Sequence, residues 1–421
     1  MSLLTLYSRI VVVKMLKYFQ KPTPSQFIWL FILAPLLLTA CQSTGKTASL
    51  NPYHGHGSTA LKGIIVTDFA PDGTLWRLFP TNKNIFVEHS TDLGHSFSRS
   101  FKVNPEQQKI NIWAENPPII KVSRSGRIHV LYYADENQRA TTYFSYSDDQ
   151  GRTFSTPILV SDEATTAMHY MDQMLVDSTG KVYFFWHDTR HGRHDPKLGS
   201  GVVSLYYTTF DSLNGRLENQ KITGGICSCC RTATALAPND KPVILARMVL
   251  ETGIRDHALI RLLDNNQWSK PIQAITDDWR VDACPEHGPA ISIDDQGRSH
   301  LVWFTLGEQR QGIFYAHTDD YGHHVSHPPL ALGDSSQLPG HPDVLAIGNR
   351  VYLTWQQFDG QQTDIVVQHS IDRGHTWSHP KNVLSVSGRS AHPKLLRKNK
   401  KAYLIWSTEA KGLQLINITH D

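Results

Sequence analysis

The sequence has little excess charge of either sign and no long hydrophobic run. Its formal charge is +3 over 421 residues, but the first forty residues include four basic residues and no acidic one. Without them the chain holds 37 basic against 38 acidic residues, so it lacks the positive field of a nucleic-acid-binding protein. Hydrophobic residues make up 40% of the chain and charged residues 19%. This composition excludes a disordered or collagen-like chain.

The longest apolar stretch, Phe27 to Leu38, has twelve residues, which are too few to cross a bilayer core of about 30 Å as a helix. It follows basic residues and ends in Leu38-Thr39-Ala40-Cys41, which gives the N-terminus the three regions of an export signal. This run resembles the lipobox of bacterial lipoproteins, whose cysteine carries fatty acyl chains such as palmitate. The resemblance implies a signal peptide over residues 1–40, lipidation of Cys41 and, because Gln42 follows, an outer-membrane lipoprotein of the cell envelope. An uncleaved membrane anchor is the alternative.

A short turn motif repeats along the rest of the chain. The pattern is Ser or Thr, then x-Asp-x-Gly, in three copies followed by an aromatic residue, and the steps between the aspartates are 57, 62, 53, 56 and 52 residues. Such a motif predicts a hairpin corner, in which Asp binds backbone amides and Gly takes a positive φ, so its aspartates are structural rather than catalytic. The copies are Ser90–Phe97, Ser147–Phe154, Thr318–Gly322 and Ser370–Trp377, with two degenerate ones at Asp211–Gly215 and Asp264–Trp268.

A second repeat lies between these corners and has the pattern strand, turn, strand, usually ending in an aromatic residue. With one strand before and one after each corner, every repeat holds four antiparallel strands, which is the pattern of a propeller blade. The sequence therefore predicts an all-β, six-bladed β-propeller over residues 60–421, joined by a flexible tether, residues 41–59, to the lipid anchor. Four tryptophans recur in phase and are predicted to fill the core between blades: Trp186, Trp303, Trp355 and Trp406.

The turn motifs resemble Asp boxes, also called BNR repeats, and the whole set is similar to the sialidase-like β-propeller family. Propellers of this type include hydrolases, binding modules and assembly factors, so the resemblance implies a fold more than an activity. The Cys227-Ser-Cys229-Cys230 run, together with Trp279 to Pro285, is also similar to a bacterial lipoprotein subgroup of that family.

One expected sialidase feature is missing from the sequence. The family places its first sugar-binding arginine in an Arg-Ile-Pro turn on the innermost strand of the first blade. The nearest match is Arg77 in Trp76-Arg77-Leu78-Phe79-Pro80, which has one extra residue and falls in the second strand. The sequence therefore argues against cleavage of sialic acid, while other glycosidase or lyase chemistry stays open.

The residues just before the innermost strands should converge at one mouth of the propeller, because those strands surround its axis. The loops that join second and third strands open on the same face, whereas the turn motifs lie on the opposite face. The residues predicted at this mouth are Glu115 and Asn116, His169 to Asp172, Cys229 to Arg231, Cys284 to His287, His341 to Asp343, His392 and the loop His187–Asp195.

Cysteine and histidine at this mouth suggest a metal site, because clustered thiolates and imidazoles suit Cu(I) or Zn(II). A disulfide between the two cysteine segments, which export would permit, is the main alternative, and free or redox-active thiols are a third. The candidate ligands are Cys227, Cys229, Cys230, Cys284, His287, His341 and His392.

Acidic and basic residues near the mouth could bind or cleave a sugar. The candidates are Asp188, Arg190, Arg231, Arg280, Asp282 and Glu286, with Glu115 as a further acid. Three functions remain open: an envelope-anchored propeller that binds a ligand or a metal ion, a sialidase-type glycoside hydrolase acting on extracellular glycans, and a scaffold for another envelope protein. We expect a monomer whose partners are the membrane and one of these ligands.

Overall fold

Antiparallel strands make up nearly all of the regular structure. The computed structural model describes residues 64–420, apart from 113–114, 137–138, 163–166, 212–214, 217, 252 and 282–285. Cys41, with the signal peptide and tether predicted for residues 1–59, lies outside the described residues. Among the described residues the only helix is a 3-10 turn, η2 (Ser335–Gln337), and no helix there is long and apolar enough to cross a membrane.

The described strands form seven blades around one axis. The first two blades contain β1 (Val66–Phe69), β2 (Leu75–Pro80), β3 (Ile85–Ser90) and β4 (Phe101–Lys102), then β5 (Lys109–Ile110), β6 (Ile119–Val122), β7 (Ile128–Glu136), β8 (Arg139–Ser147) and β9 (Ile158–Leu159). The third contains β10 (His169–Val176), β11 (Val182–Asp188), β14 (Val202–Asp211), β15 (Gly215–Arg216) and β16 (Gln220–Cys227), beside a small hairpin of β12 (His194–Asp195) and β13 (Gly199–Ser200).

The last four blades are more regular. The fourth and fifth contain β17 (Ala233–Leu236), β18 (Pro242–Arg247), β19 (His257–Arg261) and β20 (Ile272–Gln273), then β21 (Ala290–Ile293), β22 (Ser299–Leu306), β23 (Gln311–Thr318) and β24 (Leu330–Leu332). The sixth and seventh contain β25 (Gly340–Ile347), β26 (Arg350–Phe358), β27 (Thr363–Ser370) and β28 (Lys381–Val386), then β29 (Lys394–Lys398), β30 (Lys401–Thr408) and β31 (Gly412–Asn417).

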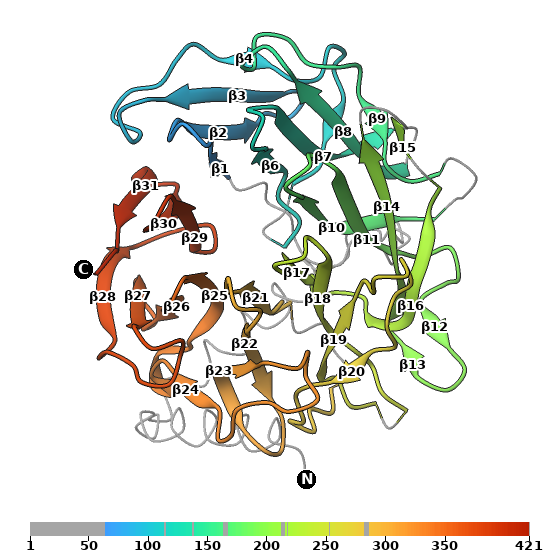
Figure 1. Ribbon diagram of the computed structural model, residues 1–421, viewed down its shortest axis with the longest axis vertical. Coiled ribbons are helices and arrows are strands. Elements are labelled where there is room, and N and C mark those ends of the chain that lie inside the picture. The colour runs from blue at the N-terminus through green and yellow to red at the C-terminus, as the bar shows by residue number, and fades with distance from the viewer. Residues whose placement is uncertain are drawn as a thin grey trace, which may run out of the picture. The chain divides into compact units, whose positions relative to one another are not determined.

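The innermost strands close a ring. In Figure 1 the strands β1, β6, β10, β17, β21, β25 and β29 surround the centre, and each contacts the next, with β29 contacting β1. Side chains also link neighbouring inner strands. Asp68 on β1 accepts a hydrogen bond from the Val122 amide of β6 at 2.9 Å, and Asp343 on β25 accepts one from the Leu395 amide of β29 at 2.8 Å. These bonds fix the spacing of the strands around the axis.

The β-propeller class is confirmed, but the predicted number of six blades is wrong. The turn motifs follow the third strand of a blade, and no motif follows β31, the third strand of the seventh blade, among the described residues. The six strand repeats counted from the sequence start in the second blade, although β1 and β2 have the same pattern of strand, turn and strand, with Phe79 near the end. The turn motifs lie in the first six blades, and the counted strand repeats lie in the last six. Together the two sets cover seven blades.

The core lies between blades, where the second strands are buried on both faces. All seven residues of β11 and all six of β18 are buried, which requires continuous apolar runs rather than alternation. The four tryptophans predicted to fill the core are at most 1% exposed. Each packs in a cluster shared with the preceding blade. Phe69 and Leu75 of the first blade pack with Tyr403 of the seventh, which closes the ring with apolar contacts.

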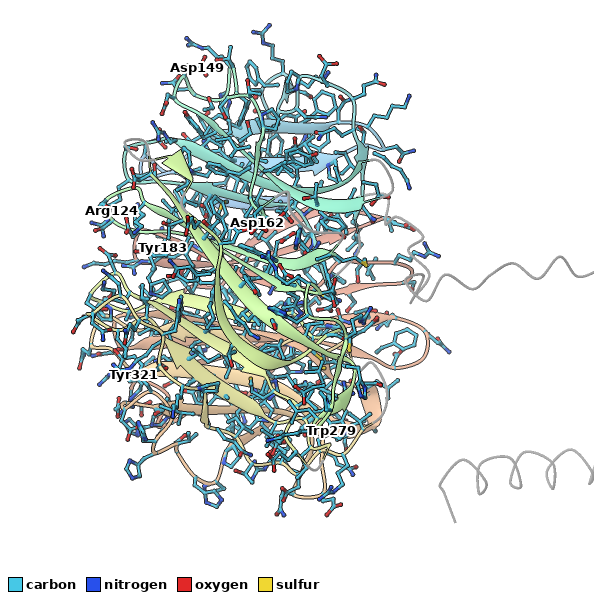
Figure 2. The ribbon with its side chains drawn as sticks, turned by 90° about the vertical axis from the view of Figure 1, so that its right-hand side faces the viewer. Arg124, Asp149, Asp162, Tyr183, Trp279 and Tyr321 are labelled. Atoms are coloured by element: carbon cyan, nitrogen blue, oxygen red, sulfur yellow. The ribbon has the colours of Figure 1, made fainter. Side chains whose placement is uncertain are left out.

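The turn motifs have the geometry predicted for them. In the first, Ser90 Oγ accepts from the Gly94 amide at 2.7 Å and Asp92 Oδ1 accepts from the Ser96 amide at 2.9 Å, while Gly94 has a φ of 86°. Figure 2 views the ring edge-on, with Asp149 and Tyr321, from two of these motifs, toward one face and Trp279 toward the other. The starts of the inner strands lie opposite the motifs, as the pairing of His169 with Asp188 at the ends of β10 and β11 requires.

Candidate functional site

Five polar side chains from five blades meet at the axis. They lie just before, or in one case at the start of, an innermost strand, which is the position that the sequence predicted to converge. We call them the axial cluster: Glu115, Arg231, His287, His341 and His392.

Glu115 lies at the centre of the axial cluster. Arg231 Nη1 donates to its Oε2 at 3.0 Å, and its Oε1 lies 3.6 Å from His341 Nδ1 and 3.5 Å from His392 Nδ1. Burial raises the pKa of Glu115, against the lowering effect of the Arg231 charge. The carboxyl group is therefore able to hold a proton more readily than an exposed glutamate.

The three histidines form a stack. The ring centroids of His341 and His392 are 3.6 Å apart, those of His287 and His341 are 4.5 Å apart, and His287 also stacks on Phe304 at 4.0 Å. Burial lowers the pKa of His287 to about 4, and the charges of nearby arginines add to this effect. Burial, together with nearby histidines and Arg231, also holds the pKa values of His341 and His392 well below the ordinary range. At neutral pH the stack is therefore uncharged.

Several polar atoms of the axial cluster have no hydrogen-bond partner among the described residues. They are Glu115 Oε1, Arg231 Nη2, His287 Nδ1 and His341 Nδ1. Buried polar atoms in folded proteins are normally paired, so a group of four at one place indicates a site for a ligand. A metal ion is one such ligand, since Glu115, His341 and His392 offer atoms within 4.8 Å of one another. The stacked rings fit a metal poorly, because an ion cannot lie in both ring planes at once.

Asp172 lies beside the axial cluster; the sequence predicted it at the mouth but did not include it among the candidate acids. Its amide donates to Asn116 Oδ1 at 2.8 Å, which ties β10 to the residue after Glu115. Thr142 Oγ1 lies 2.9 Å from each carboxylate oxygen. Burial raises the pKa of Asp172 to about 7, although these hydrogen bonds oppose the shift. A lone aspartate in a strand gives no sequence signal of this kind, because the shift arises from burial.

Asp188 and Arg190 belong to a closed ion network rather than to the axial cluster. Arg190 donates to Asp188 Oδ1 at 3.0 Å and to both carboxylate oxygens of Asp162, at 2.9 and 3.1 Å. Burial alone would raise the pKa of Asp188, but hydrogen bonds from His169 and Arg190 outweigh it and lower the pKa. Both residues therefore have partners that anchor the loop after β11.

Of the other sequence candidates, one is exposed, one is half-buried and two are not described. Arg280 is exposed, in a bridge with Ile254. Glu286 is half-buried, and its charge raises the pKa of Glu115. Asp282 and Cys284 lie outside the described residues, so their predicted roles stay predictions.

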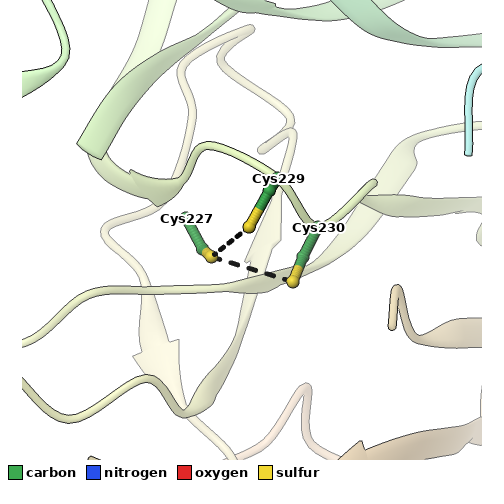
Figure 3. Close-up of side chains that lie close together, drawn as sticks. All are labelled: Cys227, Cys229 and Cys230. Atoms are coloured by element: carbon green, nitrogen blue, oxygen red, sulfur yellow. Dashed lines mark hydrogen bonds between the residues drawn. The ribbon is translucent and has the colours of Figure 1, made fainter. Parts of the chain in front are cut away.

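The cysteines form a second cluster, separate from the axial histidines. Cys227 ends β16, and its Sγ lies 3.8 Å from Cys229 Sγ and 3.7 Å from Cys230 Sγ (Figure 3). A disulfide requires about 2.05 Å, so Cys227 is bonded to neither, and all three cysteines are free. The bridge to Cys284 stays a prediction, because that residue is not described. We call residues 227–230 the cysteine turn.

Arg255 contacts the cysteine turn and was missed by the sequence reasoning. Its Nη1 donates to Cys227 Sγ at 3.2 Å, and the residue is 5% exposed. Contacts with Cys229 and Cys230, and the charge of Arg255, hold the pKa of Cys227 well below that of a free thiol. Arg255 follows a glycine turn far from the cysteines in sequence, so only the pairing of blades reveals this contact.

Arg77 lies on the second strand of its blade, as the sequence predicted. Its Nε donates to Glu88 Oε2 at 2.8 Å, and its guanidinium lies 3.4 Å from the ring centre of Phe97. The residue packs within the first blade and does not line the axis.

A cavity of about 280 Å³ lies away from the axial cluster, on the side of the turn motifs. Its lining includes Arg261, Asp264 and Tyr321, and Arg261 stacks over the Tyr321 ring at 4.1 Å. The unpartnered polar atoms, rather than this cavity, mark the candidate site.

No family model and no curated protein matches the chain. Among solved structures, an ulvan lyase of polysaccharide lyase family PL25 has a TM-score of 0.56 at 9% identity, covering 83% of this chain and 90% of its own. Polysaccharide lyase Uly1 has a TM-score of 0.52 at 12% identity, covering 90% of this chain and 94% of its own. A mutant of Trypanosoma rangeli sialidase reaches 0.43 at 14% identity, over 75% of this chain and 56% of its own. At these identities the first two matches establish the β-propeller fold and no activity.

Proposed function

We propose that this protein binds an acidic polysaccharide at the axial cluster and cleaves it by β-elimination. The observation that carries the proposal is the free hydrogen-bonding capacity of Arg231 Nη2 and His341 Nδ1 at one place. A guanidinium is suited to bind a sugar carboxylate, and an uncharged imidazole is suited to accept a proton.

The reaction needs three roles, and the axial cluster offers a residue for each. Arg231 binds the carboxylate of a uronic acid and stabilises the negative charge that develops on it. His341 takes the proton from the carbon next to that carboxylate. The electron pair left behind forms a carbon–carbon double bond, the glycosidic carbon–oxygen bond breaks, and the leaving oxygen takes a proton from Glu115. The raised pKa of Glu115 suits it to carry that proton.

The comparisons support this class of substrate. Two of the similar structures are named as polysaccharide lyases, and one ulvan lyase, with a TM-score of 0.53, is described as bound to -[GlcA(1-4)Rha3S]-, which contains a uronic acid. The export signal and lipobox at residues 1–41 would place the protein in the cell envelope, attached to the outer membrane through Cys41, where such polysaccharides are accessible.

Glycoside hydrolysis is the second candidate. This reaction commonly uses two carboxylic acids, and the site contains two. Glu115 and Glu286 could supply them, since the charge of Glu286 acts on Glu115. The two reactions differ in their products. Elimination leaves an unsaturated sugar that absorbs ultraviolet light, whereas hydrolysis releases reducing ends without that absorbance.

The test uses the mature chain with uronic-acid polysaccharides and, as a comparison, neutral ones. Binding is measured by calorimetry, and cleavage by ultraviolet absorbance and reducing ends. Arg231→Met should weaken binding by about 10–100-fold, the value of one or two charged hydrogen bonds. Arg124→Met is the matched control, because Arg124 is exposed in a turn near the opposite face (Figure 2). Equal binding by both variants, or no binding of any acidic polysaccharide, would refute the proposal.

A further inference from the structure

We propose that the cysteine turn is a binding site for one Cu(I) ion, held by the thiolates of Cys227, Cys229 and Cys230. This site is separate from the axial cluster and does not depend on the proposed function of that cluster.

The sulfur positions fit a shared metal ion. Thiolates that bind a metal at about 2.3 Å lie about 3.8 Å apart in a tetrahedral site and about 4.0 Å apart in a trigonal one. The two Sγ–Sγ distances from Cys227 are 3.8 and 3.7 Å, and all three sulfurs lie within 4.8 Å of one another. The two distances from Cys227 therefore match those expected around a shared ion.

Apolar packing explains part of the cluster but leaves its charges unexplained. The cysteines pack against Val202 and Val249, as small hydrophobic side chains would. Two buried arginines lie nearby: Arg255 contacts Cys227 Sγ, and Arg247 contacts the backbone carbonyl of Arg255. Among the described residues neither is paired with a carboxylate. Burying two such charges without counter-charges is costly, and thiolates, which form when cysteines bind a metal ion, would supply counter-charges.

The contacts of the two arginines show how they are held. Arg255 Nη1 donates to Cys227 Sγ at 3.2 Å. Arg247 donates to backbone carbonyls, at 3.0 Å for that of Arg255 and 2.7 Å for that of Phe304. Gly201 leaves room for the guanidinium, because an added Cβ there would lie 3.2 Å from Arg255 Nη2. These contacts hold the Arg255 guanidinium against Cys227 Sγ and keep the Arg247 guanidinium beside Arg255.

The charge balance favours a monovalent ion. Three thiolates beside two guanidinium groups leave one negative charge, which a single Cu(I) ion neutralises and Zn(II) would overcompensate. Soft sulfur ligands select Cu(I), and three of them suffice for it, whereas a structural Zn(II) site takes four ligands. Cys227 and Cys230 are fully buried and Cys229 is 7% exposed, so the site shields the ion from water.

The experiment uses the full chain, exported to a bacterial periplasm without a histidine tag and then reduced under nitrogen. Cu(I) is titrated against the competing chelator bicinchoninate, followed by sulfur-to-copper absorbance and elemental analysis. We expect one equivalent of Cu(I), falling below about a tenth of an equivalent in Cys227→Ser and Cys230→Ser, because each removes a ligand. Arg255→Gln should weaken binding by about 10–100-fold, as loss of a supporting contact does, and Arg255→Lys by less.

Controls separate a lost ligand from a lost fold. Ser228→Ala changes the same turn without removing a sulfur and should keep its copper, and near-ultraviolet circular dichroism should be the same for every variant. X-ray absorption of the wild-type copper protein should show three sulfur neighbours. A disulfide between any two of the three cysteines in the unreduced protein, tighter binding of Zn(II) than of Cu(I), or loss of copper in Cys284→Ser would each overturn the proposed site.

Discussion

Asp172 gives a stability prediction that needs no knowledge of the ligand. The residue is 6% exposed, and burial raises the pKa of its carboxyl group from 3.8 to about 7. Between these two pH values the folded protein holds a proton that the unfolded chain releases. The stabilisation from this proton is therefore complete below pH 3.8 and is lost as the pH rises through about 7.

The size of the effect follows from the shift. One pKa unit corresponds to about 1.4 kcal/mol, so the rise from pH 5 to the pKa of about 7 should cost the protein about 2 kcal/mol of unfolding free energy. Asp172→Asn keeps the shape of the side chain and an oxygen that can accept from Thr142. The variant cannot ionise, so we expect it to gain about 2–3 kcal/mol relative to the wild type between pH 5 and pH 8.

Urea unfolding at pH 5, 6, 7 and 8 measures this difference directly. Asp359→Asn is the control, because backbone amides of Gln362 and Gln361 lower the pKa of that exposed carboxylate, so that it stays ionised over this range. The control should run parallel to the wild type. If Asp172→Asn also runs parallel, Asp172 does not carry a proton in the folded protein at pH 5, and the reasoning from its burial is wrong.

Two further predictions concern the blades. Gly374→Ala should destabilise the protein by about 2 kcal/mol more than Gly126→Ala in urea unfolding: both glycines have positive φ, of 86° and 85°, but only at Gly374 would the added Cβ meet a neighbour, Tyr315 Oη at 2.0 Å. Equal losses would show that the Tyr315 side chain moves aside. Arg77→Leu should lower stability by about 1 kcal/mol through loss of its pairing with Glu88, yet leave glycan cleavage within about twofold of the wild type, and a large loss of cleavage would contradict the axial assignment.

The sequence predicted the fold because the same pattern of strands and turns recurs in each blade, so an unclear strand in one blade is identified by comparison with the others. Each blade places the same residue types at the same turns, so a weak strand signal at β4 or β20 does not obscure the pattern. The count failed because neither repeat covers all seven blades. The first blade has a turn motif, but its strand pair β1 and β2 was not counted, and the seventh blade has a strand pair but no turn motif after β31.

Two groups of candidate residues were separable only in three dimensions. The sequence placed His287, His341 and His392 in one metal cluster with the cysteines, because all of them lie near the starts of inner strands. The structure groups His341 and His392 with Glu115, and the three described cysteines with one another. The position of a residue along a blade predicts how far it lies from the axis. Which neighbouring side chains it contacts depends on packing, which the sequence pattern does not give.

The two clusters therefore differ in how the chain specifies them. The axial cluster needs all the blades, because Glu115 and Arg231 are 116 residues apart and meet only when the ring closes. The cysteine turn needs three neighbouring positions and one arginine from the next blade. Damage to ring closure should thus abolish glycan binding before it abolishes copper binding. Measuring glycan binding and copper binding on the same sample at increasing urea concentrations would reveal this order. If copper binding is lost first, the cysteine turn depends on the whole ring.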